Sequence, residues 1–347
     1  MSGVVETVSA APSLFARLRR RVSGCDLRVV LRGPPASPGT LPRFDGEARV
    51  EGDVVLTPTA GSFHHRGLLV ELLGTISTGR GPVDRAEVFL RQQRRFAPGA
   101  VVAATTFSFS FGGGRTYESY HGARAQVDYV VQASLERGLR STTASAGLWI
   151  TRPSEDPEKE PPIPNDNETE REPQNEMKSE GMDPPWRCRR PVVGLANTRE
   201  LSMEIGVENL LHIEVRYEKQ TFHLADQILG RVAFKTANMD LQRGEVAVVR
   251  KEFIIGGDDE EVETEVLHRF EIMDGAPIVG EVILIRLYLI SVPGLTPSYA
   301  NVGNKFRVLH FLDLMLLTRD GRKYFKQQQI HFYRQKGQEG MGEGSVM

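Results

Sequence analysis

The chain has 347 residues, of which 40% are hydrophobic and 25% are charged, and its formal net charge is −2. This length is typical of about two domains, and the composition is that of an ordinary globular protein. A near-neutral charge offers no broad basic surface, which argues against nucleic-acid binding and against direct attraction to anionic lipid. No apolar run approaches the ~20 residues that a membrane-spanning helix requires.

The first segment, residues 1–24, contains the arginine-rich stretch "SLFARLRRRVSG". A mitochondrial presequence has this composition, and so does a short basic arm that leads into a first strand; we expect the arm. The two cysteines, Cys25 and Cys188, have no metal-type spacing, and no secretory segment precedes them. We therefore expect a cytoplasmic protein without a disulfide framework.

Residues 25–139 are predicted to form a β-sandwich, because short runs with the period of a β-strand are separated by Gly, Pro and Ser. In "TFSFSF", Phe107, Phe109 and Phe111 alternate with serines, as a strand with one buried face requires. Helix-period stripes of useful length are absent from the sequence of this region.

Residues 140–187 are acidic, rich in proline and poor in large apolar residues. Such a segment cannot bury enough surface to offset its conformational entropy, so we expect a disordered insert or linker. A solvated spacer and an acidic docking segment are both compatible with this composition.

Residues 188–334 return to a β-strand pattern and are predicted to form a second β-sandwich. In "NLLHIEVRYE", Leu211, Ile213, Val215 and Tyr217 alternate with polar residues. Arg286 lies inside the apolar run "VILIRLYLI" and is expected to be partly buried in an ion pair. The glycine-rich residues 335–347 are expected to form a flexible tail.

No motif in the sequence supports catalysis or a bound cofactor. His64 and His65 are adjacent, so a strand would point them to opposite faces, where they cannot share one metal ion. The carboxylates that follow Gly256 lack the spacing of a calcium loop, and "FGGGR" lacks the features of a phosphate-binding loop. We therefore expect a protein that is not an enzyme and that binds no metal or cofactor.

The stretch "RFEIMDGAPIVGE" places the apolar pair Ile272-Met273 directly before Asp274-Gly275, which is a turn sequence. Alternation from Val262 onward puts Ile272 at the end of the core-facing row. It puts Met273 on the outward face, next to the turn. Pro277 is expected to stiffen the return of the chain.

Several ordered motifs resemble the vacuolar protein sorting 26 family, the small arrestin-like subunit of retromer. In the second half these include "MEIGVENLLHIEVRYEKQ", "RFEIMDGAPIVGE" and "RKYFKQQQIHFYR"; in the first half, "FDGEARVEGDVVL" and "TYESYHGARAQVDYVV". The resemblance implies an all-β protein of two tandem arrestin-like β-sandwich domains. It also implies a non-enzymatic subunit of an endosomal coat, held peripherally and indirectly on the cytosolic face of the endosome membrane.

The resemblance further implies the partners of the protein. These are the large α-solenoid subunit of retromer, sorting nexins, and the cytosolic tails of transmembrane cargo that returns from endosomes to the Golgi or cell surface. The loop implied to contact the solenoid contains Ile272, Met273, Asp274, Gly275 and Pro277. Two alternatives are an arrestin-type adaptor for phosphorylated receptor tails and a β-sandwich hydrolase. The near-neutral charge argues against the first, and the lack of a nucleophile–base pair argues against the second.

Overall fold

The computed structural model describes residues 25–33, 41–59, 61–79, 86–114, 117–137, 140–153, 200–207, 209–256 and 259–335. These residues form β-strands and a single 3-10 turn, Leu289–Ser291, and none of their helical structure is long and apolar enough to cross a membrane. The all-β prediction is confirmed. The chain divides into two compact units, Met1–Arg152 and Pro153–Met347, and each is described by itself.

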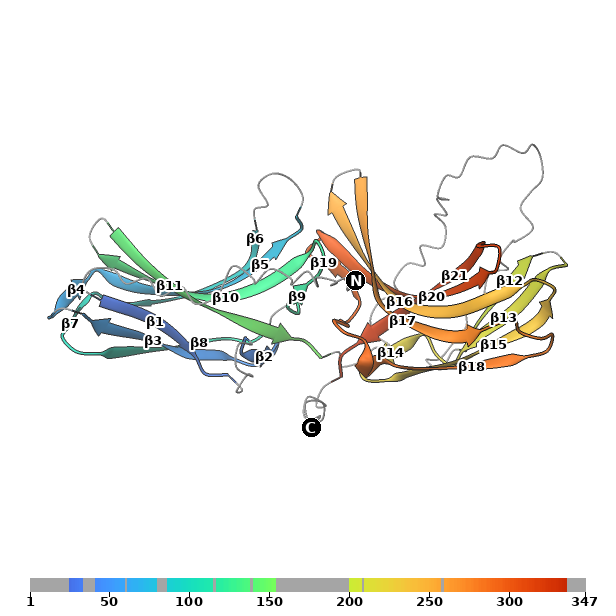
Figure 1. Ribbon diagram of the computed structural model, residues 1–347. Helices are drawn as coiled ribbons and strands as arrows, with labels where there is room; N and C mark the ends of the chain where they lie inside the picture. Colours follow the sequence, from blue (N-terminus) through green and yellow to red (C-terminus); the bar gives the residue numbers. More distant parts are fainter. Residues whose placement is uncertain are drawn as a thin grey trace, which may run out of the picture. The chain divides into compact units, whose positions relative to one another are not determined.

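The first domain contains two main sheets (Figure 1). One has the order β1-β3-β8, and the other has the order β2-β11-β10-β5-β6, with β9 also paired to β10. A small third sheet pairs β4 with β7. The strands are β1 Cys25–Leu31, β2 Arg43–Asp45, β3 Val50–Pro58, β4 Phe63–His65, β5 Gly67–Ser77, β6 Glu87–Phe96, β7 Gly99–Val101, β8 Thr105–Phe111, β9 Tyr120–His121, β10 Gln126–Arg137 and β11 Arg140–Thr151.

Alternation of apolar side chains builds the core of this domain. In β5 every second residue is buried, from Leu68 to Ile76, and in β8 Phe109 and Phe111 are buried while Ser108 is exposed. The inward direction predicted for these phenylalanines is therefore confirmed. Burying such side chains contributes about 1.5–3 kcal/mol each, before the entropy of ordering the chain is subtracted.

The predicted boundary of the first domain at residue 139 is wrong. Strand β11 begins at Arg140 and pairs with β10 over nine residue pairs, from Tyr129↔Leu148 to Arg137↔Arg140. Its Ser, Thr and Ala residues give a weak strand pattern, but β10 lies beside it and forms the hydrogen bonds that hold it in the sheet. Residues 154–187 of the predicted insert, the predicted N-terminal arm and nearly all of the predicted tail lie outside the described residues.

The second domain also contains two sheets, which lie in two layers in Figure 1. The first has the order β12-β13-β15-β18, and the second has the order β14-β21-β20-β16-β17, with β19 paired to β20. The strands are β12 Leu201–Val207, β13 Leu211–Tyr217, β14 Thr221–His223, β15 Gln227–Ala237, β16 Leu241–Gly256, β17 Asp259–Asp274, β18 Val282–Tyr288, β19 Tyr299–Val302, β20 Phe306–Thr318 and β21 Lys323–Tyr333.

One apolar cluster joins the two sheets of this domain. It combines residues of β13, such as Ile213 and Val215, with residues of β16 and β20, such as Val248 and Leu314. The alternation predicted for 211–217 is confirmed, since Leu211, Ile213, Val215 and Tyr217 are all buried. Packing of two sheets through such a cluster is what defines a β-sandwich.

Polar groups are buried beside this core, on β16 and β20. Arg250 donates one hydrogen bond from Nη2 to Glu265 Oε2 at 2.6 Å and another from Nη1 to the Gly294 carbonyl at 3.2 Å. His310 is fully buried, and its Nδ1 lies 2.9 Å from Ser298 Oγ. Burial, reinforced by the positive charge of Arg250, lowers the pKa of His310 well below its ordinary value. His310 is therefore neutral in the folded protein.

This burial predicts that the second domain loses stability as the pH falls through the ordinary histidine range. Because the pKa of His310 is depressed in the folded state, the unfolded chain binds the extra proton. The stabilisation is fully present above the unfolded pKa of about 6.5 and decreases below it. The change His310→Gln should reduce the drop in melting temperature between pH 7.5 and pH 5.5. An equal drop in the variant and the wild type would contradict this explanation.

Candidate partner-docking site

The five residues predicted to bind a partner lie together, at the end of β17 and in the turn that follows it. Residues 275–281 connect β17 to β18, so this turn crosses from one sheet of the second domain to the other. The predicted residues are Ile272, Met273, Asp274, Gly275 and Pro277. We call residues 272–281 the tip.

The backbone of the tip depends on Gly275. This residue has φ +98°, a conformation that costs a glycine little but strains any side chain with a Cβ. Its N–H donates a hydrogen bond to the Gln242 carbonyl at 2.7 Å, which ties the turn to the start of β16. Asp274 is exposed beside it and ends β17. The chain bends at Gly275, but the hydrogen-bonded turn lies further along, between Ile278 and Glu281.

Met273 faces the core, and the prediction that it points outward is wrong. Its side chain is only 8% exposed and belongs to the apolar cluster between the sheets. The residue opposite is Gly244, where an added Cβ would lie 3.2 Å from Met273 Cβ and 3.3 Å from Leu316 Cδ2. The missing side chain at Gly244 leaves the space that the methionine occupies.

The predicted core-facing row is wrong at its start: Val262 and Val266 are 50% and 41% exposed, and Val266 pairs with Val249, which lies outside the cluster between the sheets. Two β-bulges then interrupt the alternation along β17. Val249 pairs with Val266 but Val248 pairs with His268, so Leu267 is an extra residue. Glu245 pairs with Glu271 but Gly244 pairs with Met273, so Ile272 is extra as well. Each extra residue shifts the following side chain to the opposite face. The second bulge turns Met273 inward and leaves Ile272 half-buried against the core.

The apolar residues that reach solvent at the tip are Ile278 and Val279, with 73% and 61% of their side chains exposed. A tight turn presents them: the Ile278 N–H donates to Glu281 Oε2 at 2.9 Å, and the Glu281 N–H donates to the Ile278 carbonyl at 3.1 Å. Pro277 is buried beneath this turn. The sequence prediction missed the pair, although two apolar residues between Pro277 and Gly280 do indicate an exposed apolar turn.

Charged residues beside the tip are paired within the sheet. Glu245 and Glu271 face each other across β16 and β17, an arrangement that repels unless cations are near. Arg243 supplies one cation, with Nε 2.9 Å from Glu271 Oε2, and it also pairs with Glu245. Arg269 Nη1 lies 3.6 Å from Glu245 Oε2. The glutamates and arginines together fix the end of the hairpin that carries the tip.

The chemistry of the tip is that of a contact surface. Its exposed side chains are aliphatic, apart from Asp274, and they surround no nucleophile–base pair. Across the described ranges, no group of three or more His, Cys, Asp or Glu residues is arranged to hold a metal ion. Exposed aliphatic residues on a well-anchored turn are suited to fill an apolar depression on another protein.

The fold is that of a two-domain β-sandwich protein, and its second domain carries an exposed apolar turn. Residues 37–321 match the family model described as vacuolar protein sorting-associated protein 26, and the chain belongs to this family. The resemblance inferred from the sequence motifs is therefore confirmed.

Relatives in distant organisms match over most of the chain. Vacuolar protein sorting-associated protein 26B of Arabidopsis thaliana is 31% identical over 300 residues, which cover 85% of this chain and 86% of the relative. Vacuolar protein sorting-associated protein 26 of Dictyostelium discoideum is 32% identical, with 84% of this chain and 73% of the relative covered. The protein of the same name from Caenorhabditis elegans is 29% identical, with 92% and 80% covered.

Met273 is buried and Ile278 is exposed, so replacement by aspartate should lower stability strongly at Met273 and hardly at all at Ile278. Met273→Asp should unfold the second domain or lower its melting temperature strongly, because a carboxylate would lose its water among apolar neighbours. Met273→Ala should cost about 2–5 kcal/mol through the cavity it leaves. Ile278→Asp should change stability by less than about 0.5 kcal/mol, since the position is exposed. Denaturant titration of the three variants checks this, and a harmless Met273→Asp would show that Met273 is not a core residue.

Proposed function

We propose that this protein acts in vacuolar protein sorting as the small, non-enzymatic subunit of retromer. Membership of the family supports this proposal, as do the relatives that carry the sorting name over most of their length. In this role it docks on the large α-solenoid subunit and helps to recruit sorting nexins and the cytosolic tails of transmembrane cargo. It acts at the cytosolic face of endosomes, in retrograde transport to the Golgi and in recycling, and is held there through its partners.

The tip is the proposed docking site for the solenoid subunit. The observation that carries this proposal is the exposure of Ile278 and Val279 on a turn whose shape is set by Gly275 and buried Pro277. Helical repeats leave apolar grooves between neighbouring helices, and a preformed aliphatic turn fills such a groove with little loss of conformational freedom.

Within the tip, the predicted site residues divide into a contact layer and a support layer. Asp274 is exposed, as Ile278 and Val279 are, and is assigned with them to the contact layer. Met273 and Pro277 are buried and support this layer from below, and half-buried Ile272 lies between the two. A change in the support layer weakens docking by deforming the turn, whereas a change in the contact layer weakens docking directly.

Replacing the contact residues should abolish docking without unfolding the protein. The double change Ile278→Asp with Val279→Asp would force two carboxylates into an apolar groove, at a cost of several kcal/mol. Titration calorimetry against the retromer solenoid subunit should then detect no binding, while the melting temperature stays at the wild-type value.

A matched control is Val102→Asp, an exposed apolar position of the first domain, whose side chain is 75% exposed. This variant should bind the solenoid subunit as the wild type does. If the double variant at the tip stays folded and binds with unchanged affinity, the tip is not the docking site. If the wild type does not bind the solenoid subunit at all, the proposed retromer role fails as a whole.

A further inference from the structure

Strand β18 forms one edge of its sheet. The strand order is β12-β13-β15-β18, so β18 pairs with β15 on one side, and no strand of the described residues pairs with its other side. A strand at such an edge presents a row of backbone N–H and C=O groups that another strand can use.

The register identifies which residues of β18 carry these groups. The Phe234 N–H donates to the Glu281 carbonyl, and the Leu289 N–H donates to the Asp226 carbonyl, so the odd-numbered residues of this stretch bond to β15. On β15, the Leu229 carbonyl accepts from Glu218, on the other side, as the same alternation requires. The backbone groups that point away from the sheet therefore belong to Val282, Leu284, Arg286 and Tyr288.

The side chains of the same four residues lie on the outer face of the sheet. Val282, Leu284 and Tyr288 are 51%, 78% and 53% exposed, and Arg286 is exposed as well. The prediction that Arg286 is partly buried is thus wrong, because its strand lies at an edge and it points outward. Ile285 and Leu287, between them, are buried in the core.

Edge strand β17 of the other sheet is protected by charge and by bulges, and β18 is not. Edge strand β17 carries acidic side chains along its length and is interrupted by two bulges. Edge strand β12 exposes Ser202 and Glu204. Charges and bulges of this kind prevent the addition of a further strand, whereas the exposed row of β18 is apolar apart from one arginine.

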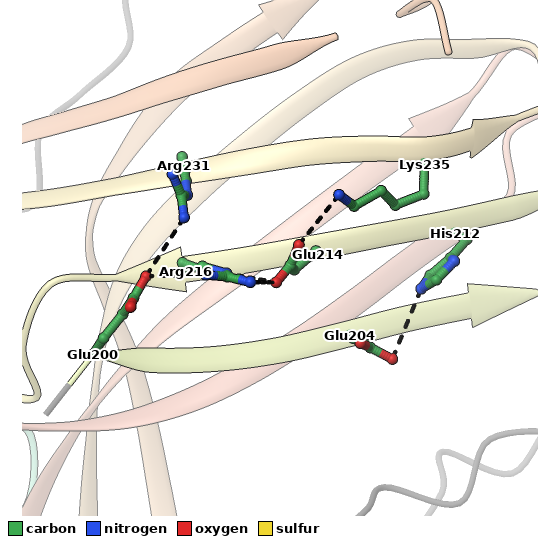
Figure 2. A network of polar contacts seen from close by, with 7 residues as sticks. All are labelled: Glu200, Glu204, His212, Glu214, Arg216, Arg231 and Lys235. Carbon is green, nitrogen blue, oxygen red and sulfur yellow. Dashed lines mark hydrogen bonds and ion pairs between the residues drawn. The ribbon is translucent and has the colours of Figure 1, made fainter. Parts of the chain in front are cut away.

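The rest of the outer face is polar and satisfied by its own ion pairs, which Figure 2 shows. Glu200 pairs with Arg231, and Glu214 pairs with both Arg216 and Lys235. His212 lies 3.7 Å from Glu204. In contrast, Arg286 forms no ion pair within the part of the chain that the structure describes. Its neighbours on β15 are Leu229, directly opposite, and Arg231, which already pairs with Glu200.

We propose that β18 is a strand-addition site for an extended, acidic–apolar segment of a partner protein. The N–H groups of Val282, Leu284, Arg286 and Tyr288 and the C=O groups of the first three pair with the backbone of the incoming strand. The Tyr288 carbonyl does not take part, because it accepts a hydrogen bond from Ser291 Oγ at 2.7 Å. On the outer face, the incoming strand carries apolar side chains opposite Val282, Leu284 and Tyr288. It carries an acidic side chain opposite Arg286. This binding site lies beyond the tip and adds a second, chemically different contact to the proposed docking on the solenoid.

The experiment uses the full chain and a twelve-residue peptide that carries valine, leucine, glutamate and phenylalanine at alternate positions, with threonines between them. A second peptide has lysine in place of glutamate. Amide exchange, followed by NMR, should slow at Val282, Leu284, Arg286 and Tyr288 when the first peptide is added. The amides of Ile283 and Ile285 should be unchanged, because they are already bonded to β15. The second peptide should bind about tenfold more weakly or worse.

Two variants separate backbone pairing from side-chain contact. Leu284→Pro removes an N–H that β15 does not use, and Leu284→Lys places a charge on the edge; both should weaken peptide binding about tenfold or more. Ile290→Lys, an exposed position beyond the strand, should not weaken it. Arg286→Glu should reverse the preference between the two peptides.

The proposal is overturned if the peptide leaves the four amides unprotected, or if a folded Leu284→Pro protein binds the peptide normally. It is also overturned if sedimentation shows a wild-type dimer that Leu284→Pro abolishes, because β18 would then pair with β18 of a second copy instead. No solenoid subunit is present in these measurements, so their failure leaves docking through the tip untouched, and failure of that docking leaves the strand-addition site untouched.

Discussion

The pairing of β16 with β17 governs the second domain. β16 is buried on both faces: Val246 and Val248 belong to the cluster between the sheets, whereas Ala247, Val249 and Phe253 pack with Leu309 and Phe311 on the opposite face. A strand buried on both sides cannot slide against its neighbour without exposing apolar groups, so its register is strongly fixed. The two extra residues of β17, Leu267 and Ile272, must therefore be accommodated as bulges. Those bulges decide which side chains face the core at the tip.

In the tip, the residues that hold the turn in shape are different from the residues that are exposed on it. Met273, Gly244 and Leu316 form a close-packed base, and a volume change there is felt through the whole turn. Ile278 and Val279, a few residues further along the chain, contact little of this base and are free to be exchanged. A loss of binding after mutation of an apolar residue in this region can thus have two physical origins. Measuring stability together with affinity distinguishes them.

Much of the fold could be predicted from the sequence, because most strands alternate regularly. The rows Leu211–Tyr217 and Phe107–Phe111 face inward as their period requires, and the chain bends at Gly275, where φ is positive. Three features could not be predicted, for physical reasons. A bulge is imposed by the partner strand, so Met273 faces inward. β11 is stabilised by β10 more than by its own composition. Arg286 is exposed because its strand lies at the edge of a sheet, whereas Arg250 is buried on β16, which has a neighbouring strand on each side.

The topology of the second domain also sets the order in which its parts can form. β16 and β17 are neighbours in sequence and close as a hairpin over a short loop, at a small entropic cost. β14 and β21 pair in parallel, and a hydrogen bond links Gln220 to Gln329 across 109 positions of the chain. Long-range parallel pairing of this kind is slow to form. During synthesis β14 is made long before β21, so its backbone groups have no strand to pair with until β21 follows. The newly made domain therefore passes through a stage in which β16 and β17 are already paired but β14 is not.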